Sequence, residues 1–216
     1  MTGDTRKKLI IDTDCGSDDA MAIAMALRDP AYEILMFTIV SGNVEADQAA
    51  RNTLLTIERA GSCEPPVYMG ARNMLLKELA FAYETHGQDG MGDLGLAPER
   101  LRLGEGHGVW RMLEALRDSE EGEIDIITLG PLTNLALALR LEPETVKKAG
   151  RVVVMGGAGF GGGNVTAAAE FNIWQDGEAA KIVMEAGLKN LMLVGWDACL
   201  GESMLMPEEI QRIRNG

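Results

Sequence analysis

Short apolar runs alternate with helical patterns along almost the whole 216-residue chain. Runs such as "ILMFTIV" and "VVVM" are apolar throughout most of their length, which is typical of strands that helices cover on both faces. The predicted strands are Lys8–Asp12, Ile34–Val40, Val67–Met69, Asp125–Leu129, Arg151–Met155 and Leu191–Gly195. The predicted helices are Asp18–Arg28, Glu45–Ala60, Val109–Ser119, Leu132–Leu141 and Gly177–Ala186. This order predicts one α/β domain over residues 1–216, with a doubly wound, mainly parallel sheet flanked by helices.

Polar or glycine-rich segments follow most of the predicted strands. In a doubly wound sheet, ligands bind beyond the carboxyl ends of the strands, so these segments are the expected place for a functional site. The segments are Asp12 and Asp14, Ser41–Asn43, Leu129–Gly130, Gly156–Gly157 and Trp196–Asp197.

The charge of the chain restricts its partners. The sequence holds 33 acidic against 20 basic residues, a net charge of −13. Such a surface repels phosphate backbones and anionic lipid, so we expect neither a nucleic acid polymer nor a membrane as partner. The three cysteines form no closely spaced pair, and the N-terminus shows no signal-peptide pattern. We therefore expect reduced thiols and a cytoplasmic protein.

Four aspartates fall within the eight positions from Asp12 to Asp19. Ser17 is expected to cap the following helix, and acids in its first turn, Asp18 and Asp19, favour the helix dipole. This explanation does not extend to Asp12 and Asp14, which stand at the end of a strand. Carboxylates so close together raise one another's pKa unless a cation neutralises them. Because no thiolate or imidazole cluster accompanies them, the ion implied is a hard one, Ca²⁺ or Mg²⁺.

The aspartates also allow a second interpretation. Haloacid-dehalogenase-like phosphatases begin with a strand followed by Asp-x-Asp, which would make Asp12 the nucleophile and Asp14 the acid. These phosphatases usually have Thr or Val at the position that Gly16 occupies here.

A glycine-rich segment follows one of the predicted strands. The glycines of "MGGAGFGG" match a dinucleotide-binding fingerprint, but "GNVTAAAEFN" follows in place of an immediate helix. We interpret this segment as a flexible loop. The alternation of Glu170 and Asn172 with Phe171 and Ile173 predicts a strand with one polar face.

The string "DTDCGSDDAMAI" resembles the signature of the inosine–uridine-preferring nucleoside hydrolases. Further motifs of that family follow in the same order: "SGNV", "HGQDGMG", "LGPLTNLALAL", "VVVMGGA" and "GNVTAAAEFNIWQDGEAAKIV". The resemblance extends from Lys8 to about Arg212. Cys15 stands where the family usually has proline.

The resemblance implies a nucleoside hydrolase-like fold and Ca²⁺-dependent hydrolysis of the N-glycosidic bond of ribonucleosides, giving ribose and free base. A water at the ion, deprotonated by Asp14, would attack C1′ of the ribosyl group. The ligands implied for Ca²⁺ are Asp14, Asp19 and the backbone carbonyl of Leu129. The residues implied for substrate binding are Asp18, Asn43, His86, Asn164, Glu170 and Asn172. Asp12 would not be a metal ligand itself but would orient the side chain of Asp14. The other histidine, His107, precedes a predicted helix and is expected to be solvated or to cap it.

The resemblance also implies a homodimer or homotetramer, and a chain longer than this one. Family members continue past the equivalent of Gly216 with a His-Asp motif that completes the Ca²⁺ shell and protonates the leaving base. We therefore expect this chain alone to be a poor enzyme or none, with apolar surface near Met204–Ile213 exposed or disordered. A non-catalytic fragment that binds Ca²⁺ or ribose is the alternative.

Overall fold

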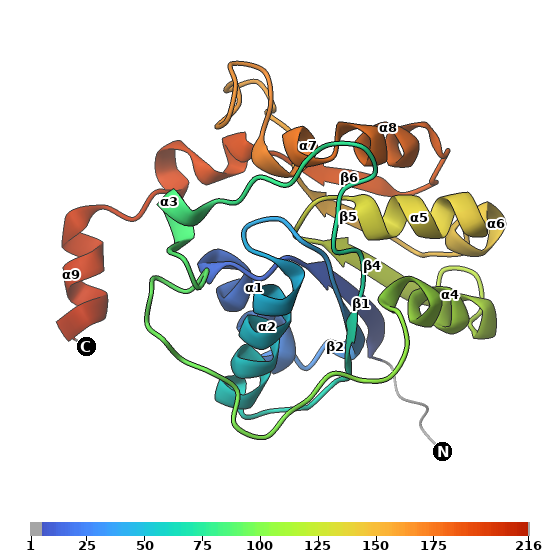
Figure 1. Cartoon of the computed structure of the whole chain (residues 1–216), viewed down its shortest axis with the longest axis horizontal. Helices are drawn as coiled ribbons and strands as arrows, with labels where there is room; N and C mark the ends of the chain where they lie inside the picture. Colours follow the sequence, from blue (N-terminus) through green and yellow to red (C-terminus); the bar gives the residue numbers. More distant parts are fainter. Residues whose placement is uncertain (1–5, 216) are drawn as a thin grey trace.

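The computed structural model describes residues 6–215, in which six strands form one parallel sheet (Figure 1). The strands are β1 (Lys7–Thr13), β2 (Tyr32–Ile39), β3 (Val67–Met69), β4 (Ile124–Thr128), β5 (Val152–Met155) and β6 (Leu191–Val194). Their order in the sheet is β3-β2-β1-β4-β5-β6. The chain thus builds outward from β1 to one side and then from β4 to the other, which confirms the doubly wound prediction.

The strands β1 and β4 are neighbours at the point where the winding direction reverses. Asp12 of β1 pairs with Thr38 of β2 on one side and with Thr128 of β4 on the other. The loops that leave the ends of β1 and β4 diverge to opposite faces of the sheet, and a crevice forms between them. The aspartates that follow β1 are therefore placed where this kind of sheet binds ligands.

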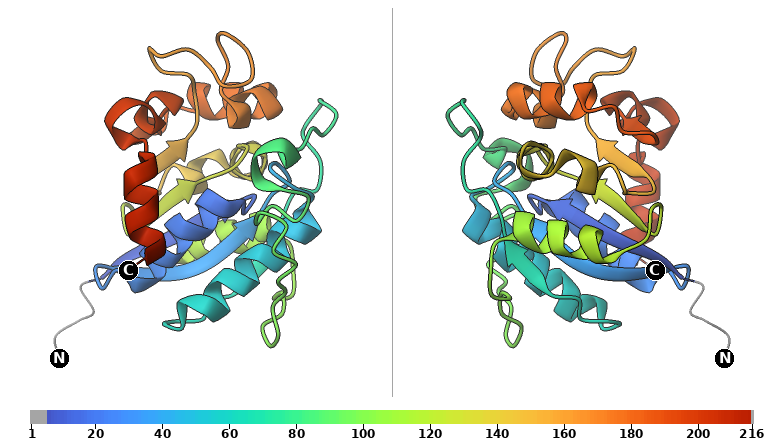
Figure 2. Two further views of the ribbon diagram at one scale, coloured as in Figure 1. Left: turned by 90° about the vertical axis from the view of Figure 1, so that its left-hand side faces the viewer. Right: turned by 90° about the vertical axis from the view of Figure 1, so that its right-hand side faces the viewer.

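Helices cover both faces of the sheet, as Figure 2 shows from two sides. The helices α1 (Ser17–Arg28) and α2 (Ala46–Ala60) pack on one face, with Ile23 and Leu27 buried against Leu9 and Ile11 of β1. The helices α4 (Gly108–Asp118), α5 (Thr133–Leu141) and α8 (Gly177–Glu185) pack on the other face, where Leu113, Leu135 and Val183 share a core with Ile10. Side chains alternate between the two cores along β1, as a strand requires.

Several short helices were not predicted: α3 (Tyr83–His86), α6 (Pro143–Val146), α7 (Phe171–Gln175), and the 3₁₀ turns η1 (Trp196–Cys199) and η2 (Gly201–Ser203). The expected strand around Glu170–Ile173 is wrong. The Glu170 carboxylate accepts hydrogen bonds from the backbone N–H groups of Asn172, at 2.9 Å, and Ile173, at 3.3 Å. These bonds satisfy the free donors of a helix start, so α7 forms in place of a strand.

The last helix, α9 (Pro207–Asn215), lies apart from the sheet. The apolar side chains of this region are exposed, as expected: Met204, Leu205, Met206, Ile210 and Ile213. The strand β6 also carries exposed apolar side chains, at Met192, Leu193 and Val194. Within residues 6–215, no helix has the length and apolar character needed to cross a bilayer.

Candidate functional site

A cavity of about 710 Å³ lies at the carboxyl ends of the strands, beside the point where the winding reverses. Eight of the residues predicted for the site line it: Asp18, Asp19, Asn43, His86, Leu129, Asn164, Glu170 and Asn172. The fold brings them together from segments far apart in the sequence. The other two predicted residues, Asp12 and Asp14, do not line the cavity, because both side chains are fully buried.

The Asp14 carboxylate lies directly behind the residues that line the cavity. Its Oδ2 accepts a hydrogen bond of 2.6 Å from the backbone N–H of Asn43. Its Oδ1 is buried and has no hydrogen-bond partner among the described residues. A Cβ atom added to Gly42 would lie 2.1 Å from Oδ2, and one added to Gly130 would lie 2.7 Å from Oδ1. The two loops therefore close around this carboxylate as only glycine permits.

The Asp19 carboxylate fixes the start of α1 while facing the cavity. Its Oδ1 accepts from the Thr13 hydroxyl at 2.9 Å, and its Oδ2 accepts from the Gly16 N–H at 3.0 Å and the Asn43 amide at 3.2 Å. The prediction that Ser17 caps the helix is wrong. Ser17 is the first residue of α1, and its hydroxyl lies 2.9 Å from Nδ1 of His86.

Burial makes ionisation costly for both of these aspartates. Burial raises the pKa of Asp14 well above its usual range, and the nearby negative charge of Asp19 raises it further. Burial, followed by the charge of Asp18, raises the pKa of Asp19 to about 7. Two carboxylates in such a place stay ionised together only when a cation offsets their charge.

The oxygen atoms around Asp14 suit a hard cation. Leu129 lines the cavity with Asp19, and its backbone carbonyl accepts a hydrogen bond of 2.7 Å from the Asn172 amide. Carboxylate and carbonyl oxygens are the ligands that Ca²⁺ binds, whereas softer ions prefer nitrogen and sulfur. Within the described part of the chain, no group of three or more His, Cys, Asp or Glu side chains is arranged to hold a metal. Asp14, Asp19 and Leu129 therefore offer oxygen ligands of the kind that Ca²⁺ binds, but fewer than the roughly 6–8 that it usually has.

Asp12 lies within β1 and faces the interior. Its Oδ1 accepts from the Thr38 hydroxyl and, at 2.7 Å, from the Asn134 amide, and its Oδ2 has no partner among the described residues. Burial raises the pKa of Asp12 to about 6 against the opposing effect of these two hydrogen bonds. Thr38 and Asn134 do not line the cavity, unlike Asn43, the partner of Asp14. Asp12 is therefore not placed to attack a substrate there, and the haloacid-dehalogenase-like alternative gains no support.

Glu170 and Asn172 join the start of α7 to the ends of β4 and β5. Besides capping α7, the Glu170 carboxylate accepts a 3.0 Å hydrogen bond from the Gly157 N–H. The Asn172 amide donates to the carbonyls of Leu129 and Met155, at 2.7 and 3.2 Å. Both residues are buried. Their polar groups are held in fixed directions at the cavity wall.

The two histidines lie in different surroundings. His86, at the end of α3, lines the cavity, and its Nδ1 lies 3.7 Å from Oδ1 of Asp18. His107 is the N-cap of α4, where its ring nitrogen accepts a 3.3 Å hydrogen bond from the Val109 N–H. The segment 156–163 forms a loop without helix or strand, so the dinucleotide-binding interpretation lacks the helix that it needs.

Other residues line the cavity that sequence motifs did not assign to the site. Among them are Phe171, Trp196 and Cys199. The position of Trp196 directly after β6 was a usable signal, because that edge of the sheet holds the site. Nothing in the sequence showed toward which side its indole would turn.

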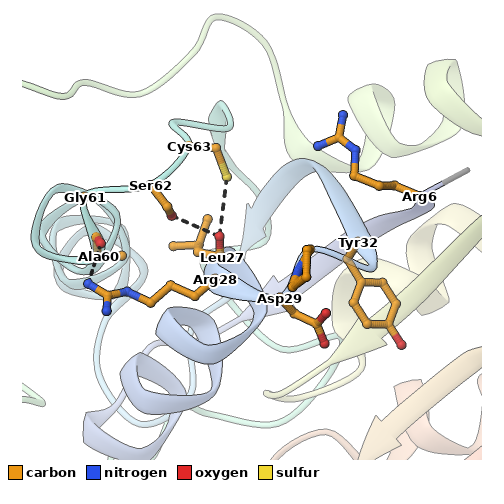
Figure 3. Close-up of a pocket in the computed structure, with 10 residues that line it drawn as sticks. Arg6, Leu27, Arg28, Asp29, Tyr32, Ala60, Gly61, Ser62 and Cys63 are labelled. Carbon is orange, nitrogen blue, oxygen red and sulfur yellow. Dashed lines mark hydrogen bonds between the residues drawn. The ribbon is translucent and has the colours of Figure 1, made fainter. Parts of the chain in front are cut away.

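A separate cavity of about 530 Å³ lies near the amino ends of the strands (Figure 3). The end of α1 and the residues after α2 form much of its wall, and both the Ser62 hydroxyl and the Cys63 thiol donate to the Leu27 carbonyl. No residue predicted for the site lines this cavity.

Comparisons with known proteins agree with the geometry at the carboxyl edge of the sheet. The family described as "Inosine-uridine preferring nucleoside hydrolase" matches residues 9–216. The chain belongs to this family. The match includes every residue from Asp12 to Asn172 considered above, and it confirms the resemblance seen in the motifs.

Similar proteins support the same assignment. The "probable uridine nucleosidase 2" of Arabidopsis thaliana is 44% identical over 184 residues, which cover 84% of this chain and 57% of that protein. The solved structure of "Plant nucleoside hydrolase - PpNRh1 enzyme" has a TM-score of 0.83 and 39% identity, covering 88% of this chain and 60% of the other. The purine-preferring ribonucleoside hydrolase from Gardnerella vaginalis gives 0.83 and 33%, covering 88% and 61%. The chain thus spans about 60% of the length of such relatives.

Proposed function

We propose that this site hydrolyses the N-glycosidic bond of ribonucleosides to ribose and free base. The observation that carries the proposal is the buried Asp14 carboxylate, held between Gly42 and Gly130 and hydrogen-bonded to Asn43, which lines a cavity with both polar and apolar walls. Membership of a family of nucleoside hydrolases supports the reaction class.

The proposal includes Ca²⁺, held by the carboxylates of Asp14 and Asp19 and by the carbonyl of Leu129. When bound, the ion would offset the two buried negative charges and lower the pKa of a neighbouring water. The buried Oδ1 of Asp14, which has no partner among the described residues, is a fitting atom for this electrostatic role.

In the reaction, Asp14 accepts a proton from the attacking water as general base. The cavity carboxylates of Asp18 and Glu170 stabilise the positive charge that develops on the ribosyl ring as the bond to the base breaks. Asn43, Asn164 and Asn172 would bind the ribose hydroxyls together with these carboxylates. Because the site binds every ribose hydroxyl, a substrate that lacks one of them leaves buried polar groups of the protein unpaired. Ribonucleosides are therefore preferred over deoxyribonucleosides as substrates.

Asp12 and His86 have supporting places in the proposal. Asp12 is a positioning residue: its hydrogen bonds to Thr38 and Asn134 tie the end of β1 to β2 and α5, and so fix where Asp14 lies. His86 closes the cavity beside Asp18 on the side of α3.

The proposal extends to partners and compartment. We propose a cytoplasmic homodimer or homotetramer that acts on small nucleosides and binds no nucleic acid polymer. The net charge of −13 supports the last point, and the three unpaired cysteines support a reducing compartment. Light scattering during gel filtration measures the assembly; a monomer at all concentrations would contradict that part.

The test of the reaction uses inosine and uridine with the protein in excess and Ca²⁺ present, and free base is measured by chromatography. We expect slow release of base that Asp14→Asn abolishes. The matched control is Asp118→Asn, which removes an equal charge from an exposed position at the end of α4. Base release that is unchanged in Asp14→Asn would contradict the role of Asp14. Hydrolysis of p-nitrophenyl phosphate that depends on Asp12 would contradict the reaction class.

A further inference from the structure

We infer that Trp196 is the platform on which the nucleobase stacks, and hence that it determines how tightly different bases are held. This inference deepens the proposed function, on which it rests, by assigning the side of the cavity that receives the leaving group.

Trp196 is fixed close to the polar part of the site by two consecutive hydrogen bonds. Its backbone N–H donates to the Gly157 carbonyl at 2.7 Å, and the Gly157 N–H donates to the Glu170 carboxylate at 3.0 Å. The start of η1 is therefore attached to the same loop that carries a proposed ribose-binding carboxylate. A nucleoside bound through its ribose to Glu170 would bring its base within reach of this segment.

The cavity has apolar lining residues as well as polar ones, and they match the two parts of a nucleoside. The apolar lining residues include Ala22, Ala82, Val165, Phe171 and Trp196. Trp196 is half-buried and is the largest flat aromatic surface among them. Aromatic rings stack on any nucleobase because every base has a π-face. The polar residues suit the ribose, and this indole suits the base.

A thiol on the same turn lies on the same wall. Cys199, at the end of η1, lines the cavity, and burial together with the charges of Asp18 and Glu170 raises the pKa of its thiol. Cys63 is also exposed but lies in the separate cavity at the other edge of the sheet (Figure 3). Cys15 is buried. The chain thus contains one accessible thiol at the proposed base site and another far from it.

The first test is tryptophan fluorescence with inosine, hypoxanthine and D-ribose as probes. We expect inosine and hypoxanthine to quench Trp196 and ribose to leave it unchanged. Trp196→Ala should remove the quenching and weaken inosine binding, measured by calorimetry, by about 10-fold to 100-fold, since stacking contributes on that order per base. Trp196→Phe should restore most of the affinity. Trp110→Phe, which changes an exposed residue of α4, is the control and should leave both quenching and affinity as they are.

The second test measures alkylation of the thiols by iodoacetamide, with each cysteine followed by mass spectrometry. Inosine should slow the labelling of Cys199 and leave that of Cys63 unchanged, so that each molecule contains its own control. This measurement does not depend on turnover or on the behaviour of a variant.

The outcomes separate this inference from the proposed function. Inosine that binds, with Trp196 unquenched, Cys199 unprotected and affinity unchanged in Trp196→Ala, overturns the inference and leaves hydrolysis standing. Inosine that protects Cys199 and quenches Trp196 but is never hydrolysed supports the inference and contradicts the proposed function. Absence of binding by inosine and hypoxanthine at their solubility limits overturns the inference as well.

Discussion

Replacement of Asp14 by asparagine should stabilise the protein without metal and destabilise it relative to the wild type when Ca²⁺ is present. Asp14 is fully buried, and burial and the charge of Asp19 both raise the pKa of its carboxyl. At neutral pH the metal-free protein must either ionise this group at a cost or bind a proton. Asparagine keeps an oxygen that accepts from the Asn43 N–H and removes the charge.

The size of the effect has an upper limit that the unfolded chain sets. Burial, followed by the charge of Asp19, raises the pKa of the Asp14 carboxyl well above its usual range. At pH 7 the cost of burying this group cannot exceed the cost of binding a proton, which is about 4 kcal/mol for an aspartate whose unfolded pKa is about 3.9. The new amide group would lie where Oδ1 has no partner, which costs about 1–3 kcal/mol. The net gain for Asp14→Asn without metal is therefore at most about 1–3 kcal/mol.

Acid and Ca²⁺ should each remove this advantage. Because the raised pKa lets the folded protein bind protons that the unfolded chain has lost, stability without metal falls as the pH rises from about 4 to about 7. At about pH 4 to 5, the wild type binds those protons, and the gain from Asp14→Asn disappears. Ca²⁺ at 100 times its dissociation constant would stabilise the wild type by about 2.7 kcal/mol and the variant hardly at all.

The assay is urea unfolding followed by circular dichroism, with EDTA or with Ca²⁺, at acidic and neutral pH. Asp118→Asn is the control for the loss of one exposed charge and should behave as the wild type does in its response to Ca²⁺. If Asp14→Asn is less stable than the wild type in EDTA at neutral pH, or if Ca²⁺ stabilises both equally, the assignment of Asp14 to a buried cation site is wrong.

Three further results are expected. Glu170→Ala should lower the free energy of unfolding by about 0.5–2 kcal/mol, because α7 loses its N-cap, and should weaken D-ribose binding measured by calorimetry. 2′-Deoxyinosine should release hypoxanthine about a hundredfold more slowly than inosine or worse, and equal rates would show that the 2′-hydroxyl is not bound. A chimera in which the remainder of the Arabidopsis relative follows Gly216 should release base at least about a hundredfold faster than this chain, because it supplies a proton donor. It should also bind less of a hydrophobic dye, because the added segment covers exposed apolar side chains. Equal turnover would show that the added segment contains no acid or metal ligand that the reaction needs.

Periodicity alone predicted the sheet and its main helices, because buried strands such as Val152–Met155 contain little but apolar residues. The expected boundaries lie within two residues of those observed, and β3 (Val67–Met69) is as predicted. The order of elements then placed the ends of β1 and β4 at one edge, which is why eight of the ten predicted site residues line one cavity. The alternation of strands and helices was therefore enough to predict the fold and the edge of the sheet that holds the site.

The remaining features depend on contacts that a linear pattern does not contain. The residues from Glu170 to Ile173 alternate as a strand does, but the Glu170 carboxylate caps a helix start. Ser17 has the right residue type for a cap, but Gly16 is the N-cap of α1, and its N–H donates a hydrogen bond to the Asp19 carboxylate. Trp196 belongs to none of the motifs; its place in the cavity lining and the hydrogen bond from its backbone N–H to the Gly157 carbonyl show where it lies relative to the site.

The most direct test of the account is the Asp14-dependent release of hypoxanthine from inosine and of uracil from uridine, measured with this chain in excess and Ca²⁺ present, and repeated with the chimera. The account predicts slow release by the chain, faster release by the chimera, and loss of both in Asp14→Asn with retention in Asp118→Asn. Failure of either protein to release more base than its Asp14→Asn variant would contradict the proposed hydrolysis.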